Sequence, residues 1–369
     1  MSTYQRATVT GDGLRLHLNE NTAGCSPAVL RALAALTPDQ IASYPDYTSA
    51  INATAAWFGV PRDWVLLVNG LDEGLHLAAA AAAACRAPSH PGTQAPQHPD
   101  TLAPWPPGTF RGLILEPAFE MYAACIEETG GSVVRVMPRP DFAFSLDDVL
   151  KAGEDARLIY LTDPNNPTGL GLPAGAIDAI AAARPRATIV VDEAYADFSG
   201  RSFIASLRAD TAGRYRNVIV GRTFAKGHGL AALRIGALIA RPETLAPLAA
   251  LQAPYSLNIA ATVALEAALS DERWLASCVA EARASKQAVY EFCGRHAVAY
   301  WPSEANFVLI NAGARATELV AYLAARGIFV RDRSTAPGCG GCVRITTGLI
   351  AHTARCLRAM ETFYAPRPN

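Results

Sequence analysis

Short apolar runs alternate with segments of helical spacing between residues 112 and 240. Two of these runs, over 158–161 and 187–191, are apolar throughout or nearly so, and each is followed by polar residues. Runs of this length with helices between them are typical of a mostly parallel sheet that is covered by helices on both faces. The pattern therefore predicts an α/β protein.

The segments that flank this region contain their own helix and strand signals. Ser26 is a plausible N-cap, with Pro27 at the first position of a helix. Before residue 86 we expect an extended segment over 13–18, helices over 26–37 and 47–59, a strand over 64–68 and an Ala-rich helix after Asn69-Gly70. After residue 240 we expect helices over 242–269, 271–292, 315–326 and 351–364, and strands over 297–300, 306–310, 328–331 and 342–346.

Residues 86–110 differ in composition from the rest of the chain, because they contain seven prolines together with Ser, Thr, Gln and two histidines. Such a segment cannot form a regular helix or a central strand. We interpret it as a solvent-exposed insertion. His90 and His98 lie in it without a cluster of carboxylates or cysteines, so no metal site is predicted.

The composition narrows the classes of function. The net charge is −1 and the pI about 6.7, with no basic stripe, so neither nucleic acid nor a membrane surface is an expected partner. The N-terminal residues lack the apolar run of a signal peptide, and no segment has the length of a membrane span. Eight scattered cysteines fit a reducing cytoplasm. The Cys339-Gly340-Gly341-Cys342 pair lacks partners for zinc and is interpreted as an incidental loop pair.

One lysine stands out chemically. Lys226 lies among small residues, with Thr223 three positions before it and Arg234 eight positions after it. A lysine that forms a Schiff base beside a bound phosphate requires a crowded backbone, a nearby fixed cation and a partly desolvated amine. A lysine and an arginine in an ordinary glycine-rich surface loop could have the same spacing. This segment alone therefore does not distinguish a Schiff-base lysine from a surface lysine.

Two predicted strands deliver polar residues at their carboxyl ends. The first is followed by Asn165-Asn166-Pro167-Thr168-Gly169, and the second by Asp192, with Tyr195 three residues later. Polar groups at the carboxyl ends of parallel strands are where open α/β sheets bind ligands. Taken singly, the first segment could be an ordinary turn and the aspartate a helix N-cap.

In this order the segments resemble the class I and II aminotransferases, pyridoxal-phosphate enzymes of fold type I. The closest resemblance is to the histidinol-phosphate aminotransferase branch. It also includes Asn19-Glu20-Asn21, Tyr44-Pro45-Asp46, Asn69 to Glu73, Glu116 to Tyr122, Arg331 to Arg333 and Arg344 to Gly348. The resemblance implies a large domain over 41–245 with a mostly parallel seven-stranded sheet and a smaller α+β domain over 246–369. It also implies an arm over 1–40 that belongs in part to the small domain.

The resemblance assigns roles around the cofactor, pyridoxal 5'-phosphate. Lys226 would form the Schiff base and then move a proton as a general base and acid. Asp192 would pair with the ring nitrogen and keep it protonated. Tyr195 and Asn166 would hydrogen-bond the phenolic oxygen, and Phe119 would stack on the ring. The cofactor phosphate would be bound by Gly70, Leu71, Asp72, Thr223 and Arg234.

The remaining assignments concern the substrate and a second subunit. Arg344 matches an arginine that binds the substrate carboxylate. Arg331 matches a position near the substrate phosphate, although Arg333 could take that role instead. Asn21 borders the substrate. Tyr44 matches a tyrosine that reaches the cofactor phosphate of the other subunit, which implies a homodimer with shared active sites.

The sequence thus predicts a cytoplasmic transaminase that acts on small amino-acid and keto-acid substrates. The expected pair is histidinol phosphate with 2-oxoglutarate and glutamate. Three alternatives remain open. They are an aromatic or other amino-acid aminotransferase, a threonine-phosphate-type decarboxylase on the same fold, and a cofactor-binding protein that has lost catalysis. Retention of Lys226 argues against the third, because binding alone does not require the lysine.

Overall fold

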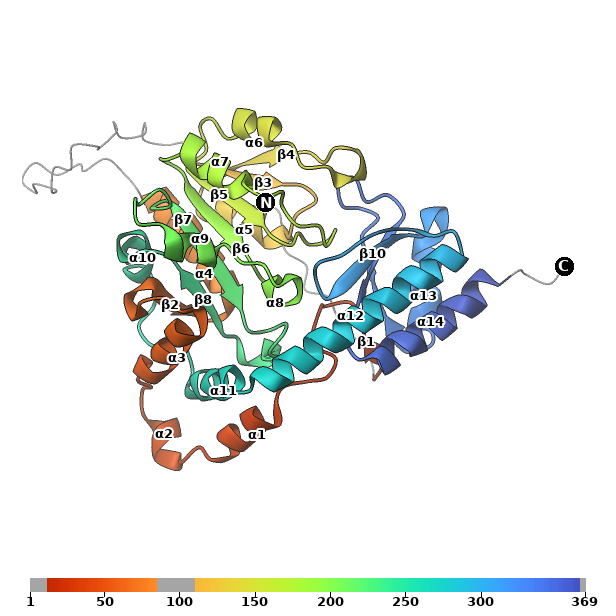
Figure 1. Ribbon diagram of the computed structural model, residues 1–369, viewed down its shortest axis with the longest axis horizontal. Helices are drawn as coiled ribbons and strands as arrows, with labels where there is room; N and C mark the ends of the chain where they lie inside the picture. Colours follow the sequence, from red (N-terminus) through yellow and green to blue (C-terminus); the bar gives the residue numbers. More distant parts are fainter. Residues whose placement is uncertain (1–11, 85–109, 366–369) are drawn as a thin grey trace, which may run out of the picture.

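A computed structural model of the chain describes residues 12–84 and 110–365 (Figure 1). Apart from Phe110, the predicted insertion over 86–110 lies outside the described residues. A seven-stranded sheet forms the centre of the molecule, in the order β2-β8-β7-β6-β5-β3-β4. β8 runs antiparallel to both of its neighbours, β2 and β7, and the other pairs in this sheet are parallel. Its strands are β2 (Val65–Val68), β3 (Arg111–Leu115), β4 (Ser132–Val136), β5 (Leu158–Thr162), β6 (Thr188–Asp192), β7 (Val218–Thr223) and β8 (Gly236–Ile239).

Helices cover both faces of this sheet, as the sequence predicts. Successive side chains of a strand point to opposite faces, so Ile189 and Val191 enter one apolar core and Val190 enters the other. The first core also contains residues of α3 (Thr48–Phe58), α6 (Leu146–Ala152), α7 (Ala176–Ala183), α9 (Ile204–Ala209) and α11 (Ile259–Leu269). The second contains residues of α4 (Gly70–Ala84), α5 (Glu120–Glu128) and α10 (Pro242–Ala249).

The C-terminal third forms a second, smaller unit beside the sheet (Figure 1). Its four-stranded antiparallel sheet has the order β12-β13-β10-β9. A separate parallel pair joins the N-terminal β1 (Leu14–Arg15) to β11 (Ile328–Phe329). The elements of this unit are α12 (Glu272–Arg295), β9 (Ala299–Trp301), β10 (Phe307–Asn311), α13 (Ala316–Ala324), β12 (Arg331–Asp332), β13 (Cys342–Thr346) and α14 (Ile350–Tyr364). The domain boundaries themselves stay a prediction.

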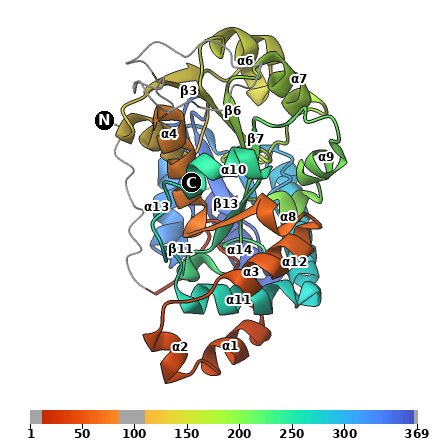
Figure 2. The ribbon, with the colours of Figure 1, turned by 90° about the vertical axis from the view of Figure 1, so that its left-hand side faces the viewer.

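Two predicted elements are divided in the structure, and one helix was not predicted. The helix predicted over 26–37 corresponds to α1 (Pro27–Ala34), capped by Ser26, and the unpredicted α2 (Pro38–Ala42) follows it. Figure 2 shows both at one edge of the molecule, where α1 packs against α11. The prediction of one continuous helix over 242–269 is wrong. The segment is broken between α10 and α11, where Pro254 lacks an N–H and Asn258 caps the new helix. The strand predicted over 328–331 is two short strands, β11 and β12, in different sheets.

Candidate active site

A cavity of about 230 Å³ opens at the carboxyl ends of β5, β6 and β7, between the large sheet and the smaller unit. Thr162, Asp192 and Thr223, which line it, are the last residues of these three strands. Parallel strands end at one edge of a sheet, so their terminal side chains converge there. Of the predicted site residues, the cavity brings together Leu71, Asp72, Phe119, Asn166, Asp192, Tyr195, Thr223, Lys226, Arg234, Arg331 and Arg344.

Three predicted site residues do not line this cavity. Gly70 lies directly behind it, at the N-terminus of α4. Asn21 Nδ2 donates to the carbonyl of Gly227 at 2.8 Å and lines a neighbouring surface cavity. Tyr44 is 80% exposed and stacks on Tyr255, with 4.4 Å between ring centroids. The roles assigned to all three stay predictions.

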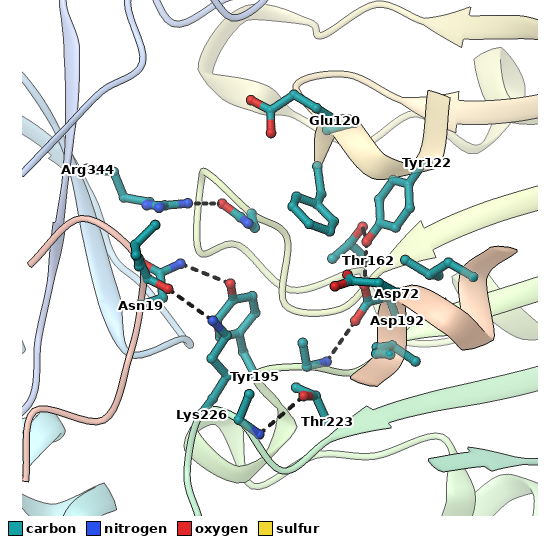
Figure 3. A pocket seen from close by; sticks show the side chains of 18 of the residues that line it. Asn19, Asp72, Glu120, Tyr122, Thr162, Asp192, Tyr195, Thr223, Lys226 and Arg344 are labelled. Atoms are coloured by element: carbon teal, nitrogen blue, oxygen red, sulfur yellow. Dashed lines mark hydrogen bonds between the residues drawn. The ribbon is translucent and has the colours of Figure 1, made fainter. Parts of the chain in front are cut away.

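Lys226 extends its amine into the cavity from the loop after β7 (Figure 3). Its Nζ donates to the backbone carbonyl of Leu18 at 3.0 Å. Burial, together with the positive charge of Arg344, lowers the pKa of Lys226 to about 8. The amine is therefore close to the balance between its charged and neutral forms near neutral pH, as a nucleophile or a proton carrier requires.

Asp192 lies on the opposite side of the cavity and is almost fully buried. Its Oδ2 accepts a hydrogen bond from Tyr122 Oη at 2.6 Å, and its Oδ1 accepts one from the backbone N–H of Ala194 at 2.9 Å. Tyr122 Oη also lies 2.8 Å from Thr162 Oγ1. Burial raises the pKa of Asp192 to about 6, although both hydrogen bonds favour the carboxylate. The two hydrogen bonds therefore hold the Asp192 carboxylate at one position, where it can bind a cationic group in the cavity.

Tyr195 and Asn166 are each oriented by a residue from the smaller unit or the N-terminal arm (Figure 3). Tyr195 Oη accepts from Asn19 Nδ2 at 2.9 Å, which leaves its own O–H to donate. Asn166 Oδ1 accepts from Arg344 Nη1, which leaves the amide NH₂ as its remaining donor. Burial raises the pKa of Tyr195 above its ordinary value, so the phenol stays protonated. Both side chains thus present hydrogen-bond donors.

The N-terminus of α4 and Arg234 form a cationic end of the cavity. Arg234 Nη2 donates to Asp72 Oδ2 at 2.7 Å. Gly70 has φ +72°, and a Cβ at this position would lie 2.5 Å from Arg234 Nη2. Only glycine therefore allows the guanidinium this close to the free N–H groups of the helix. Together with the Thr223 hydroxyl, these groups are donors that suit a phosphate.

Three arginines lie at the other end of the cavity, and they differ in their partners. Arg333 Nη1 donates to Glu120 Oε1 at 2.6 Å. Arg344 is buried and donates to Asn166 and to the backbone carbonyl of His17, at 2.8 Å for the latter, but to no carboxylate. Arg331 likewise has no ion pair with any residue in 12–84 or 110–365. Arg331 and Arg344 therefore face this end of the cavity without an ion pair among the described residues, and the charge of Glu120 acts on both.

Comparison with known proteins identifies the family. The class I and II aminotransferase family matches residues 106–359. The chain belongs to this family. Histidinol-phosphate aminotransferase 2 of Ralstonia nicotianae is 35% identical to it, over 95% of this chain and 89% of the relative. Histidinol-phosphate aminotransferase of Symbiobacterium thermophilum is 33% identical, over 97% and 92%.

A solved structure extends the comparison to three dimensions. Histidinol-phosphate aminotransferase from Sinorhizobium meliloti, in complex with pyridoxal-5'-phosphate, superposes with a TM-score of 0.81 at 25% identity. The match covers 96% of this chain and 91% of the other. The resemblance stated from the motifs is thus confirmed, including its branch. The fold class, the transaminase class and the pyridoxal-phosphate cofactor are confirmed at the level of the family.

Several residues that line the cavity have no role predicted from the sequence. Tyr122 and Asn19 stood within the quoted motifs, but only the fold brings them to Asp192 and Tyr195. Glu120 and His17 also line the cavity. Burial, with the charges of Arg15, Arg331 and Arg344, lowers the pKa of His17 to about 4. His17 is therefore neutral at neutral pH and adds no charge.

The described residues lack a metal-binding cluster and a membrane-spanning helix. No group of three or more His, Cys, Asp or Glu within 12–84 and 110–365 is arranged to hold a metal ion. No helix in this part of the chain is both long enough and apolar enough to span a bilayer.

Proposed function

We propose that this aminotransferase moves the amino group between histidinol phosphate and 2-oxoglutarate, using pyridoxal 5'-phosphate. The observation that carries the choice of substrate is the pair Arg331 and Arg344, two cavity arginines with no carboxylate partner among the described residues. A phosphate monoester carries close to two negative charges at neutral pH. It would neutralise both guanidiniums, whereas a single carboxylate would leave one unpaired.

The cavity residues fit the cofactor. Gly70, Arg234 and Thr223 would hold its phosphate, because together they offer free helix N–H groups, a guanidinium and a hydroxyl. Asp192 would hold the ring nitrogen, since its buried carboxylate faces the cavity from the opposite side to Lys226. When bound, pyridoxal phosphate supplies an electron-withdrawing ring that stabilises negative charge at the substrate carbon.

Each residue around the bound cofactor would then have its own role in the reaction. The Lys226 amine, with a pKa of about 8, can accept a proton from the substrate and return it close to neutral pH. The carboxylate of Asp192 would keep a proton on the ring nitrogen, and Tyr122 would hold that carboxylate in place. Tyr195 and Asn166 would donate hydrogen bonds to the phenolic oxygen. Phe119 would stack on the ring.

The alternative activities receive less support. An aromatic amino acid carries one carboxylate and would engage only one of the two arginines, whereas glutamate, with two carboxylates, would engage both in either enzyme. A decarboxylase for a phosphorylated amino acid would use the same arginines, but the relatives that are 33–35% identical over nearly the whole chain are named as histidinol-phosphate aminotransferases. A protein that only binds the cofactor has no use for a buried lysine of lowered pKa.

We also propose a homodimer that resides in the cytoplasm. Tyr44 does not line the cavity of its own chain and is exposed, as are Ile41, Leu251 and Tyr255. Large apolar side chains gathered on a surface mark an interaction site. A second copy that covered this face would bring its Tyr44 toward the cofactor phosphate, as the resemblance implies.

The test of the substrate is a half-reaction without an amino acceptor. Purified enzyme is mixed with histidinol phosphate, histidinol, phenylalanine or glutamate, and the conversion of its pyridoxal form to the pyridoxamine form is followed by absorbance. We expect histidinol phosphate to convert the enzyme with the highest kcat/KM and glutamate to convert it as well. Equal conversion by phenylalanine would favour an aromatic aminotransferase. Release of carbon dioxide from phosphothreonine would favour a decarboxylase.

A further inference from the structure

Cys339 lies in the loop that joins β12 to β13, Cys342 is the first residue of β13, and both are fully buried. The backbone N–H of Cys342 donates to the carbonyl of Cys339 at 2.9 Å, and Gly341 has φ +76°. The four residues therefore form a β-turn, which brings its end Cα atoms to within about 7 Å. Disulfides require a Cα separation of roughly 4.4–6.8 Å, so the turn already places the two cysteines in range.

The two thiols also interact with one another. The neighbouring Cys342 thiol lowers the pKa of Cys339, and the neighbouring Cys339 thiol raises that of Cys342. The positive charge of Arg333 lowers the pKa of Cys339 further. A thiol of lowered pKa beside a second, protonated thiol is the arrangement of an attacking and a resolving cysteine. The other described cysteines have no such pairing, and burial raises the pKa of Cys125, Cys293 and Cys356 to about 12.

We propose that Cys339 and Cys342 form a reversible dithiol–disulfide site that is oxidised by a small-molecule disulfide such as oxidised glutathione. The Cys339 thiolate attacks one sulfur of the oxidant, forms a mixed disulfide and releases one thiolate. Cys342 then loses its proton, attacks the Cys339 sulfur and releases the second thiolate. The cysteine pair loses two electrons and two protons, and the oxidant becomes two thiols.

The surroundings of the turn allow this exchange and connect it to the cavity. Gly338 and Gly340 are exposed, and no atom within 4 Å would meet a Cβ on Gly340. Both cysteines pack in a buried cluster with Leu309, so the turn must open locally before the oxidant reaches Cys339. The backbone N–H of Arg333 donates to the carbonyl of Cys342 at 2.9 Å. The disulfide would therefore close a ring over residues 339–342, which this hydrogen bond links to Arg333 and which includes neither Lys226 nor Asp192.

The test uses the full-length holoenzyme, incubated with oxidised glutathione in native buffer. Free thiols are then blocked, the protein is digested with trypsin and the peptides are weighed. The peptide over 334–344 contains both cysteines and no other. We expect the mass of this peptide to fall by two hydrogen atoms and to recover after treatment with dithiothreitol. Cys125, Cys293 and Cys356 should remain free thiols that react with the blocking reagent. Recovery of this peptide with two free thiols, or oxidation only in denaturant, would overturn the proposal.

A variant tests the order of attack. In Cys342→Ser the resolving thiol is absent, so a glutathione adduct should accumulate on Cys339. Cys356→Ser is the matched control, because Cys356 is equally buried but lies on α14 away from the turn. It should form the 339–342 disulfide as the wild type does. A Cys342→Ser protein in which Cys339 remains a free thiol would show that Cys339 does not attack. The measurement on the wild type stands even if this variant does not fold, and it is independent of the substrate proposed above.

Discussion

Tyr122 Oη and Asp192 Oδ2 lie 2.6 Å apart at the floor of the cavity, so the phenol donates a hydrogen bond to the buried carboxylate. Burial and the nearby charge of Asp192 raise the pKa of Tyr122 well above its ordinary value, which keeps its proton in place. Tyr122 comes from α5 and Asp192 from the end of β6. The packing of this helix on the sheet therefore fixes the position of the group proposed to hold the ring nitrogen.

Removal of that hydrogen bond should impair the chemical step. In Tyr122→Phe the carboxylate loses one of two donors, a loss of roughly 1.5–3 kcal/mol for a charged acceptor. We expect kcat to fall about tenfold or more, with a smaller change in KM. Tyr160→Phe is the control, because Tyr160 stacks on Tyr122 at 4.9 Å but donates to the carbonyl of Leu75. Equal losses of kcat in the two variants would mean that Tyr122 contributes only through packing.

The buried carboxylate should also destabilise the cofactor-free protein above pH 6. The pKa of Asp192 is raised from 3.8 when exposed to about 6 in the fold. Stability from this group is therefore full below the lower value and is lost as the pH rises through the higher one. A shift of this size corresponds to on the order of 3 kcal/mol. Asp192→Asn, which does not titrate, should gain stability relative to the wild type across this window.

Urea unfolding of the cofactor-free proteins between pH 4.5 and 8 measures the difference. The advantage of Asp192→Asn should grow up to about pH 6 and then stay constant. The same variant should have a much lower kcat when loaded with cofactor, because an amide does not keep the ring nitrogen protonated. A stability difference that is independent of pH would contradict the raised pKa. A near-normal kcat would place the partner of the ring elsewhere.

Covalent attachment of the cofactor should follow the titration of Lys226. Only the neutral amine is nucleophilic, and its pKa is about 8. The rate at which cofactor-free enzyme attaches pyridoxal phosphate should therefore rise with pH up to about 8 and level off above it. Stopped-flow absorbance measures this rate. Borohydride reduction followed by tryptic mapping should place the label on Lys226.

Another lysine provides an internal control for this assignment. Burial also lowers the pKa of Lys286 to about 8, but its Nζ donates to the carbonyl of Ser303 and does not line the cavity. If a low pKa alone determined reactivity, both lysines would be labelled. Label on Lys286, or on any lysine other than Lys226, would refute the assignment. Lys226→Ala should lose turnover by several orders of magnitude, since proton transfer and covalent exchange both depend on it.

Arg331 and Arg344 should contribute differently to substrate binding. Arg344 is buried, so Arg344→Ala should weaken every anionic substrate, by on the order of 2–5 kcal/mol in kcat/KM. Arg331→Ala should reduce the preference for histidinol phosphate over histidinol, which differ only in the phosphate. Steady-state kcat/KM for the two compounds gives this ratio. Arg333→Ala is the control, because Glu120 already occupies its guanidinium. If Arg333→Ala changed the ratio of kcat/KM for the two compounds and Arg331→Ala did not, Arg333 would be the arginine that recognises the phosphate.

The sequence predicts those parts of the site that depend on single elements. Asp192 could be placed because it ends a buried strand, and Lys226 because its neighbours are small. The break between α10 and α11 was missed, because the apolar spacing continues across Pro254. Contacts between distant segments could not be predicted either. Arg333 and Glu120, for example, are brought together only when the smaller unit packs beside α5.

The last prediction concerns the second subunit. Tyr44 is exposed and does not line the cavity of its own chain, so any role at a cofactor phosphate requires the cavity of a partner. Two-fold symmetry would then make both active sites composite. We expect Tyr44→Ala to weaken cofactor binding and activity, even though the side chain lies outside its own cavity. Tyr255→Ala, which removes the stacked neighbour, is the control for loss of local packing.

Mixing of two inactive variants distinguishes a shared site from a local effect. Tyr44→Ala and Lys226→Ala are combined under conditions that allow subunits to exchange. In a mixed dimer one site has Lys226 from the first chain and Tyr44 from the second, while the other site lacks both. Because one complete site is rebuilt, part of the activity should return, up to a quarter of the sites if exchange is random. If Tyr44→Ala is inactive alone and the mixture gains nothing, each site is built within one chain, and the proposal of shared sites fails.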